Sequence, residues 1–431
     1  MVQSTSKRRL VALDLFAGVG GLSLGFEQAG FDVLAAVEYD PVHAAVHKYN
    51  FPMTEVICRD VKNLSGADVR QAAHRGWRLH HPSGPAWDGA VDVVIGGPSC
   101  QGFSTMGRRD QDDERNDLLL EFVRIVVEIR PRAFCLENVP GLLQERYTPI
   151  REKALDSLRD AGYKITGFDR PVSAADFGVP QNRKRVVILG ALEADVPPLK
   201  PSSMPVTVAD SFARLPDASD SPELMTMDSV GRDTFPISPW NHADSLYARR
   251  MTGDEVDPED RSRRRNWDSS LLTNSRLSAH TSESIRRFEL TPQGAVEPVS
   301  RFYRLSLSGQ SRTLRAGTGR ERGAFTSPRP LHPVRHRVIT VREAARLHSF
   351  PDWFRFHITS WHGHRQIGNS VPPLLARAAG KSIAKALHAS PTRARSVLNF
   401  GDESLLSMSM AEAAQLFSAN PSEMPAQRTR K

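Results

Sequence analysis

The stretch from Val11 to Gly30, VALDLFAGVGGLSLGFEQAG, decides the fold. Its first residues, Val11 to Phe16, are apolar apart from Asp14 and predict a buried strand. The glycine-rich residues 17–21 end that strand, and Leu22 to Ala29 predicts a helix that stops at the next glycine. A strand, a glycine-rich turn and a helix in this order are typical of the opening of a parallel α/β sheet.

The same alternation continues through the first 190 residues. Further strands are predicted at Val33 to Val37, Glu55 to Cys58, Val91 to Ile95, Ala133 to Leu136 and Val186 to Leu189. One helix is predicted to begin at Pro41, and another covers Leu118 to Ile129, where apolar residues recur at helical spacing. The pattern predicts an α/β fold with a Rossmann-like, mostly parallel sheet covered on both faces.

Length and composition limit the class of protein. The chain has 431 residues, enough for two domains or for one large domain with an insertion. No apolar run approaches the roughly 18 residues of a membrane span. Asp14 interrupts the apolar stretch after Lys7-Arg8-Arg9, so no signal peptide is expected. The chain has 3 cysteines, which are too few for a disulfide framework and do not have the spacing of a zinc site. This indicates reduced thiols in a cytosol-like compartment.

The chain is basic, with a formal net charge of +8, and 47 of its 57 basic residues are arginine. A basic chain favours a polyanionic partner such as nucleic acid. Arginine carries the planar fork that suits phosphates and guanine edges. A GC-rich coding genome would give the same arginine bias with no functional meaning.

The glycine-rich turn after the first strand is a candidate cofactor site. Backbone amides at a helix N-terminus can approach a ligand closely after such a turn. Glu38 ends the next strand, where an acidic side chain can bind ribose hydroxyls, and Asp60 follows the third strand. Ser23 stands where the dinucleotide fingerprint has its third glycine, so the pattern indicates a nucleoside cofactor of unspecified kind. A purely structural turn is the alternative.

Cys100 lies in the loop Gly96 to Ser104, directly after a predicted strand. A cysteine at the carboxyl end of a strand is well placed to meet a substrate. Cys58 and Cys135 lie inside apolar strands and are expected to be small buried packing residues.

Two further segments carry charged side chains beside strands. Glu137 directly follows Ala133 to Leu136, and partial desolvation would favour the protonated form that can donate a proton. The alternative is a carboxylate that caps a helix near Pro140. Arginines alternate in Gln181 to Arg185, which projects them to one side of an extended segment, where they could hold a phosphate or a carbonyl oxygen. The alternative is a solvated charged face.

Taken together, these segments resemble the cytosine-5 DNA methyltransferase family. The resemblance covers about residues 9 to 190 and 300 to 388, and it rests on Asp14 to Gly21, Gly96 to Ser104, Asp113 to Asn116 with Leu118, Glu137 to Val139, Gln181 to Arg185, Arg337 to Leu347 with Phe350 to Asp352, and Gln366 to Pro373. One departure is Ser99, where the family usually has proline before the nucleophile.

The resemblance implies the fold of class I methyltransferases and a set of catalytic roles. It implies that Cys100 attacks carbon 6 of cytosine and that Glu137 protonates or hydrogen-bonds ring nitrogen 3. It further implies that Arg183 and Arg185 hold the carbonyl oxygen of the base and neighbouring phosphates. The target carbon lies inside a stacked duplex, so the base would have to be flipped out.

The resemblance also implies S-adenosylmethionine as the cofactor, with no metal. Phe16 would pack on the adenine, Glu38 would hold the ribose, and Asp60 the adenine amine. The remaining cofactor residues implied are Gly18 and Gly20 in the turn, and Leu118, Asn369 and Ser370, which would close the pocket.

The domain organisation follows from the same comparison. Residues 1–194 and 362–388 are predicted to form the catalytic, S-adenosylmethionine-binding domain, and residues 195–361 a smaller, irregular target-recognition domain. Within the latter, residues 195 to about 330 are rich in Pro, Ser, Asp and Arg, which fits long loops or a partly disordered insertion. Base readout is expected from arginines such as Arg312, Arg315, Arg320 and Arg322. Residues 389–431 are predicted to be a loose polar tail, apart from a short helix around Met410 to Phe417.

The resemblance implies double-stranded DNA as the partner. It also implies a monomeric protein of the prokaryotic cytoplasm that is associated with the nucleoid and does not contact a membrane. A companion restriction endonuclease is a further possible partner. Methylation of RNA cytosine is the closest rival, because tRNA-methylating relatives share these motifs. The long middle segment favours DNA, since a duplex reader needs a groove-facing part. A non-catalytic DNA-binding regulator would not need Cys100 and Glu137. A nicotinamide-dependent oxidoreductase would explain only the first glycine-rich turn.

Overall fold

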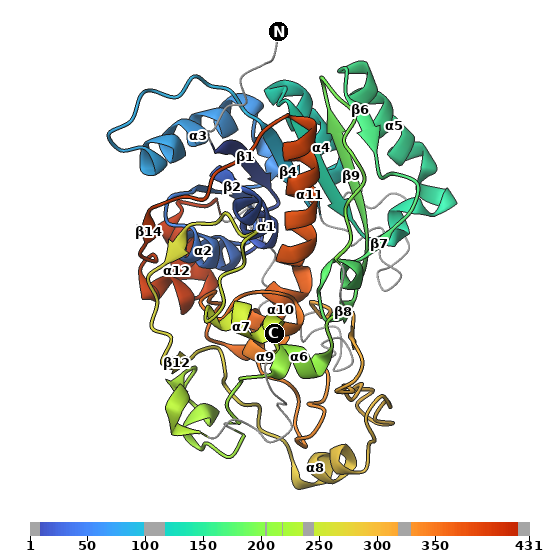
Figure 1. Ribbon diagram of the computed structural model, residues 1–431, viewed down its shortest axis with the longest axis vertical. Coiled ribbons are helices and arrows are strands. Elements are labelled where there is room, and N and C mark those ends of the chain that lie inside the picture. The colour runs from blue at the N-terminus through green and yellow to red at the C-terminus, as the bar shows by residue number, and fades with distance from the viewer. Residues whose placement is uncertain are drawn as a thin grey trace.

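The computed structural model describes residues 9–98, 117–202, 205–217, 219–235, 245–317 and 329–420, which contain an eight-stranded sheet (Figure 1). Its strands are β1 (Leu10–Leu15), β2 (Phe31–Glu38), β3 (Glu55–Cys58), β4 (Val93–Gly96), β5 (Ala133–Asn138), β6 (Lys164–Thr166), β7 (Val172–Ser173) and β9 (Lys184–Ala191). The order is β3-β2-β1-β4-β5-β9-β6, with β7 also paired to β9. The first five strands of this order are parallel, whereas β9 runs antiparallel to β5, β6 and β7. The predicted α/β fold with a mostly parallel sheet is confirmed.

The predicted strands are all present, with their ends shifted by at most 2 residues. The predicted helices correspond to α1 (Gly21–Ala29), α2 (Pro41–Asn50) and α4 (Asp117–Ile129). Pro41 occupies the first turn of α2, and the Asp40 side chain accepts a 3.0 Å hydrogen bond from the backbone N–H of Val42. The helices α3 (Gly66–His80) and α5 (Thr148–Asp160) and the short strands β6 and β7 were not predicted.

Helices cover both faces of the sheet (Figure 1). One face buries apolar residues of α3, α4 and α5, and the other buries those of α1 and α11 (Pro373–Ala386). The helices α1 and α11 approach closely at Gly25, where a Cβ atom would lie 2.3 Å from the Cβ of Ala376. The last long helix of the chain therefore packs on the first.

The described part of residues 195–330 is folded, but its elements are short. They are α6 (Val208–Phe212), β10 (Val230–Gly231), α7 (Leu246–Thr252), β11 (Arg264–Arg265), β12 (Leu271–Leu272), α8 (Ser282–Glu289) and β13 (Ser311–Arg312), with 3-10 helices at Glu223–Met225 and Arg232–Thr234. Of the two interpretations left open by the sequence, the one with long loops holds for the described residues. The predicted helix that follows is present as α9 (Val341–Leu347), and α10 (Ser360–Asn369) precedes α11.

The middle segment is attached to the sheet by a shared hydrophobic cluster. Phe212 and Leu224 belong to the same buried cluster as Ala344 of α9, Leu24 of α1 and Tyr49 of α2. The described middle residues therefore share a hydrophobic core with α1 and α2.

Ion pairs add to this attachment. Arg265 lies 2.7 Å from Glu27 of α1, and both side chains are buried. Asp257 lies 2.6 Å from Arg377 of α11, and Arg263 lies 3.0 Å from Asp32 of β2. The mixed charges of residues 254–265 therefore bind the middle segment to β2, α1 and α11.

The C-terminal segment from residue 397 to residue 420 is not a loose tail, so that prediction is wrong for residues 397–409. The strand β14 (Val397–Leu398) pairs with β11, and a 3-10 helix (Glu403–Leu406) and α12 (Met410–Leu416) pack against α2. Leu405 and Leu406 are 5% and 1% exposed, so a few apolar side chains anchor an otherwise polar segment. The predicted short helix is confirmed as α12. In the part of the chain that the structure describes, no helix is long and apolar enough to cross a membrane.

Candidate active site

The polar residues singled out in the sequence gather where the parallel strands end. Neighbouring parallel strands present their carboxyl ends at one edge of the sheet. Phe16 follows β1, Glu38 ends β2, Asp60 follows β3, and Glu137 is the penultimate residue of β5. Parallel pairing of these strands brings the candidate residues to that edge.

Glu38 fixes the glycine-rich turn. Its Oε2 accepts a 2.7 Å hydrogen bond from the backbone N–H of Gly18, and its Oε1 accepts one of 2.9 Å from that of Asp40. Gly20 has a φ of +101°, a left-handed conformation that glycine adopts without steric cost. Burial raises the pKa of Glu38 above its ordinary value, although His43, with Nδ1 3.9 Å from Oε1, acts in the opposite direction.

Phe16 and Leu118 belong to the same end of the sheet. Both are partly buried against the hydrophobic cluster of the face covered by α4. Phe16 has a φ of +59°, which a bulky residue rarely adopts, and such strain is concentrated at functional sites. Asp60 caps a short 3-10 helix (Val61–Asn63), because its Oδ1 accepts a 3.0 Å hydrogen bond from the backbone N–H of Lys62.

The turn that follows α10 touches the glycine-rich turn. A Cβ atom on Gly21 would lie 3.1 Å from the Cβ of Ser370, so the two turns are in contact. Asn369 is exposed, whereas Ser370 is buried and its hydroxyl donates to the carbonyl of Gln366 at 2.7 Å. The predicted cofactor residues thus occupy one continuous edge rather than scattered positions.

The residues at this edge fit a nucleoside cofactor. Ionised carboxylates only accept hydrogen bonds, and ribose hydroxyls and an adenine amine donate them. Glu38 and Asp60 supply such acceptors at the ends of the adjacent strands β2 and β3, and Phe16 supplies an apolar ring at the end of β1. Within the described residues, no three His, Cys, Asp or Glu side chains are grouped so that they could hold a metal ion.

A second constellation lies at the ends of β4 and β5. Oε1 of Glu137 is 2.6 Å from Nε of Arg185, and each side chain is 11% exposed. A Cβ atom on Gly97 would lie 3.0 Å from Oε2 of Glu137, and the Asn138 side chain donates to the carbonyl of Pro98 at 3.4 Å. The loop that leads to Cys100 therefore begins against the Glu137 carboxylate. Cys100 itself lies outside the described residues.

The two other cysteines are buried, as predicted. Cys58 and Cys135 are 4% and 1% exposed. Burial raises the pKa of Cys58 to about 12 and that of Cys135 still further. Neither thiol has the thiolate character that a nucleophile needs.

Alternate residues of the segment Gln181 to Arg185 lie on one side, as predicted. Gln181 and Arg183 are buried and Arg185 is partly buried, whereas Asn182 and Lys184 are exposed. Arg183 and Arg185 nevertheless have different surroundings. Arg185 reaches Glu137, while the guanidinium of Arg183 points into the interior and binds backbone carbonyls.

Asp14 carries a polar network beneath the glycine-rich turn. Its Oδ2 accepts a 2.6 Å hydrogen bond from the hydroxyl of Ser23, which lies 3.1 Å from Nε2 of His47. Burial raises the pKa of Asp14 to about 7, and the charge of Glu38 adds to that rise. Burial lowers the pKa of His47 to about 3. His47 was not predicted from the sequence as part of this network, because no local pattern distinguishes it from other polar residues on a helix.

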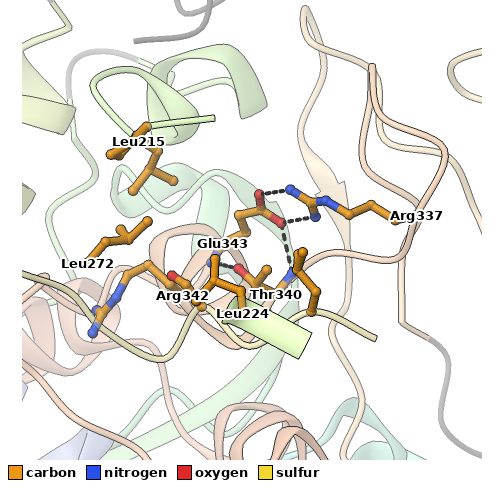
Figure 2. A pocket seen from close by; sticks show the side chains of 10 residues that line it. Leu215, Leu224, Leu272, Arg337, Thr340, Arg342 and Glu343 are labelled. Carbon is orange, nitrogen blue, oxygen red and sulfur yellow. Dashed lines mark hydrogen bonds and ion pairs between the residues drawn. The ribbon is translucent and has the colours of Figure 1, made fainter. Parts of the chain in front are cut away.

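A small cavity lies away from this edge, between the middle segment and α9 (Figure 2). It is lined by Leu215, Leu224 and Leu272 and by the capping-box residues Thr340 and Glu343. The space open to water there is about 20 Å³, enough for about one water molecule. It is too small for a nucleoside.

The polar side of this cavity is closed by an ion pair. Glu343 binds both ends of the Arg337 guanidinium, at 2.7 and 2.9 Å (Figure 2). Burial opposes ionisation, but Arg337 lowers the pKa of Glu343 to about 2. The pair is internally satisfied, so the cavity offers no free charge to a ligand.

Comparisons with known proteins show the family to which the chain is similar. The family model described as C-5 cytosine-specific DNA methylase matches residues 10–385. The chain is 47% identical to the Type II methyltransferase M.XorII of Xanthomonas oryzae pv. oryzae, over 95% of this chain and 92% of that protein. It is 30% identical to the Type II methyltransferase M.DdeI of Desulfomicrobium norvegicum, over 86% and 88% of the two chains. A crystal structure described as a DNA modification methyltransferase encoded within an E. coli prophage superposes with a TM-score of 0.68 and 33% identity, over 88% of this chain and 99% of that chain.

Proposed function

The chain belongs to the C-5 cytosine-specific DNA methylase family and is a DNA cytosine-5 methyltransferase, and from this premise we propose how it acts. The protein transfers a methyl group from S-adenosylmethionine to carbon 5 of a cytosine that is flipped out of a specific duplex sequence. The reaction passes through a covalent bond between Cys100 and carbon 6 of that cytosine.

The observation that carries this proposal is the position of the Glu137–Arg185 pair beside the loop that leads to Cys100. Asn138 binds the carbonyl of Pro98, which precedes Cys100 by two residues. The sequence thus leads from this carboxylate directly to the residue proposed as the nucleophile.

In the proposed mechanism, the thiolate of Cys100 adds to carbon 6 and converts the ring into a carbon nucleophile at carbon 5. Glu137 donates a proton or a hydrogen bond to ring nitrogen 3, which stabilises the charge that develops in the ring. Arg185 holds Glu137 in place and donates to the carbonyl oxygen of the base. After methylation a base removes the carbon-5 proton, and the electron pair of that bond expels the thiolate.

S-adenosylmethionine, when bound, supplies an activated methyl group on a sulfonium. Glu38 would accept from the ribose hydroxyls and Asp60 from the adenine amine, while Phe16 would cover the ring. Gly18 and Gly20, together with Leu118, Asn369 and Ser370, would shape the rest of the pocket.

DNA recognition is assigned to residues 195–361, and catalysis to residues 1–194 and 362–388. Arg312 supports this assignment, because it is exposed and its guanidinium lies 4.0 Å from the Tyr303 ring centroid, which holds the planar fork in one orientation. Flipping the base out of the stack costs a few kcal/mol, which contacts to the surrounding duplex must offset. Arg315 lies three residues further on and is also exposed.

The wider setting follows from the relatives. The names of M.XorII and M.DdeI describe Type II methyltransferases. We infer a bacterial restriction-modification system in which this protein, as a monomer, methylates nucleoid DNA and protects it from a companion endonuclease.

The experiment that tests the proposal is methyl transfer from labelled cofactor to duplex DNA and, separately, to tRNA. Bisulfite sequencing of the DNA product then identifies the methylated cytosine and its flanking bases. Label in duplex DNA at a fixed sequence supports the proposal. Label in tRNA alone would establish the RNA alternative instead.

A further inference from the structure

Arg183 joins three parts of the chain. Its side chain is 2% exposed, and its guanidinium donates to three backbone carbonyls. Nη1 binds the carbonyl of Leu314 at 2.8 Å, and Nη2 binds those of Gly368 at 2.9 Å and Ser370 at 3.0 Å. Leu314 follows β13, and Ser370 belongs to the turn assigned to the cofactor.

Gln181 and His348 close this network into a ring. The Oε1 of Gln181 accepts from the backbone N–H of Leu314 at 3.0 Å, and its Nε2 lies 3.0 Å from Nδ1 of His348. An amide nitrogen can only donate, so Nδ1 accepts and Nε2 of His348 carries the hydrogen that binds the carbonyl of Ser370 at 2.9 Å. Burial lowers the pKa of His348 well below its ordinary value, which favours this neutral tautomer.

The two joined segments also touch directly. The strand β13 pairs in parallel with β8 (Gln181–Asn182). A Cβ atom on Gly368 would lie 2.2 Å from the backbone nitrogen of Ala316, so only glycine allows this approach. A displacement of residues 311–317 would therefore disturb the bonds that hold Ser370.

We propose that Arg183 is a positioning residue that couples the DNA-facing segment 311–317 to the cofactor turn 369–370, and that it does not touch the target base. The inference rests on the proposed assignment of these two segments. DNA bound to the first segment stabilises the arrangement of the second, so each ligand strengthens the binding of the other. Arg185 alone of the two arginines then serves the base.

The test uses Arg183→Lys, because an ammonium cannot reproduce the planar fork that reaches three carbonyls. Calorimetry measures S-adenosylmethionine binding with and without duplex DNA that contains the target sequence. In the wild type, DNA should tighten cofactor binding about 5-fold or more, and in Arg183→Lys this gain should fall below about 2-fold. In steady-state assays the KM values of DNA and cofactor should both rise, while kcat at saturation stays within about 3-fold of wild type.

Arg304→Lys is the matched control. Arg304 is also buried and also binds backbone carbonyls, among them those of Thr291, Pro333 and Val334, but all of them lie within residues 195–361, the part assigned to DNA recognition. Its substitution should lower the Tm as that of Arg183 does, yet leave the gain in cofactor affinity intact. Gly368→Ala, which disturbs the same junction by steric contact, should reproduce the effect of Arg183→Lys.

Three results would overturn the inference. A fall in kcat with unchanged affinities in Arg183→Lys would place Arg183 on the base. An equal loss of coupling in Arg304→Lys would show a general effect of destabilisation. In the third result, the wild type methylates DNA, but adding DNA does not increase its affinity for the cofactor. The coupling would then be absent, and the proposed function would remain. A wild type that does not methylate DNA would overturn both the coupling and the proposed function.

Discussion

Nε of Arg185 lies 2.6 Å from Oε1 of Glu137, and the two residues, 48 positions apart in sequence, belong to neighbouring antiparallel strands. The pair places a carboxylate and a planar guanidinium side by side, so both can contact the edge of a single pyrimidine. A charge-assisted contact of this kind fixes the carboxylate in one orientation.

The first prediction concerns this pair. Glu137→Gln should lower kcat by about 10²- to 10⁴-fold, because an amide cannot transfer a proton to ring nitrogen 3. Cofactor affinity, measured by calorimetry, should stay within about 2-fold, since Glu137 lies outside the proposed cofactor contacts. Asp156→Asn, which alters an exposed ion pair of 2.7 Å on α5, serves as the control and should leave both quantities unchanged. Wild-type turnover by Glu137→Gln would refute the assigned role.

The second prediction concerns the covalent step. Duplex DNA with 5-fluorocytosine at the target position should trap the enzyme in a stable adduct in the presence of cofactor, because fluorine cannot leave as a cation. Cys100→Ser should abolish both adduct and turnover, since a serine hydroxyl is scarcely ionised near neutral pH. Cys58→Ser and Cys135→Ser provide the controls, because both thiols are buried and their raised pKa values keep them protonated. Mass spectrometry should locate the DNA on Cys100, and its attachment to any other residue would disprove the mechanism.

A third prediction addresses cofactor binding. Glu38→Ala should weaken S-adenosylmethionine binding by about 1–3 kcal/mol, the usual cost of losing a charged hydrogen-bond partner. Burial raises the pKa of Glu38, so protonation should begin to weaken cofactor binding at a higher pH than an ordinary glutamate would. Affinity should therefore decrease as the pH falls toward this raised pKa, and Glu38→Gln should show a flatter profile. Glu55→Ala is the control, because Glu55 lies at the amino end of β3, whereas the proposed cofactor residues lie at the carboxyl ends of the strands. Tight binding of NAD in place of S-adenosylmethionine would contradict the assignment.

The fourth prediction separates recognition from catalysis. A chimera that carries another family member's residues in place of 195–330 should methylate a different sequence and still yield 5-methylcytosine. Residues 254–265 should be kept from this chain, because Asp257 and Arg265 form ion pairs with α11 and α1. Bisulfite sequencing gives the outcome. An active chimera with the original sequence preference would assign base readout to another part of the chain.

The fifth prediction concerns acid stability. Burial lowers the pKa of His332 to about 3, so the unfolded chain takes up a proton near pH 6.5 that the folded chain does not accept. The unfolded state then binds more protons, and stability decreases as the pH falls below about 6.5, by up to about 1.4 kcal/mol per pH unit for this group. His332→Asn should make urea unfolding less dependent on pH between about 6.5 and 4.5. His336→Asn, at an exposed position, should leave that dependence unchanged; equal slopes in wild type and His332→Asn would contradict the prediction.

The sheet could be predicted from the sequence because its strands are buried on both faces. Runs such as Val11 to Leu15 are almost wholly apolar because both faces of the strand are buried. Such a run can be recognised without knowing which strands pair with it. The short strands β6 and β7 depend on pairing with β9, which no local pattern encodes. The tail was mistaken for loose chain because its burial rests on a few residues such as Leu406.

The candidate site could be predicted in part. Glu38 and Glu137 stand at strand ends, and strand ends are visible in the sequence. Arg183 and Arg185 look equivalent in sequence. Contacts with distant parts of the chain distinguish them, because Arg183 binds Leu314, 131 positions away, and Arg185 binds Glu137, 48 positions away. The partner of Ser370, His348, follows an ordinary helix and gives no signal of its own.

The packing of α11 on α1 has a consequence for synthesis of the protein. The strands and α1 emerge from the ribosome early, but the helix that covers their second face begins only at Pro373. At about 5–20 residues per second, the roughly 180 residues between β9 and α11 take about 9–36 s to translate. During that interval the apolar residues Leu22 and Phe26 of α1 lack their final cover. We therefore expect a ribosome-associated chaperone to bind this exposed apolar face of the nascent chain until the last long helix has emerged.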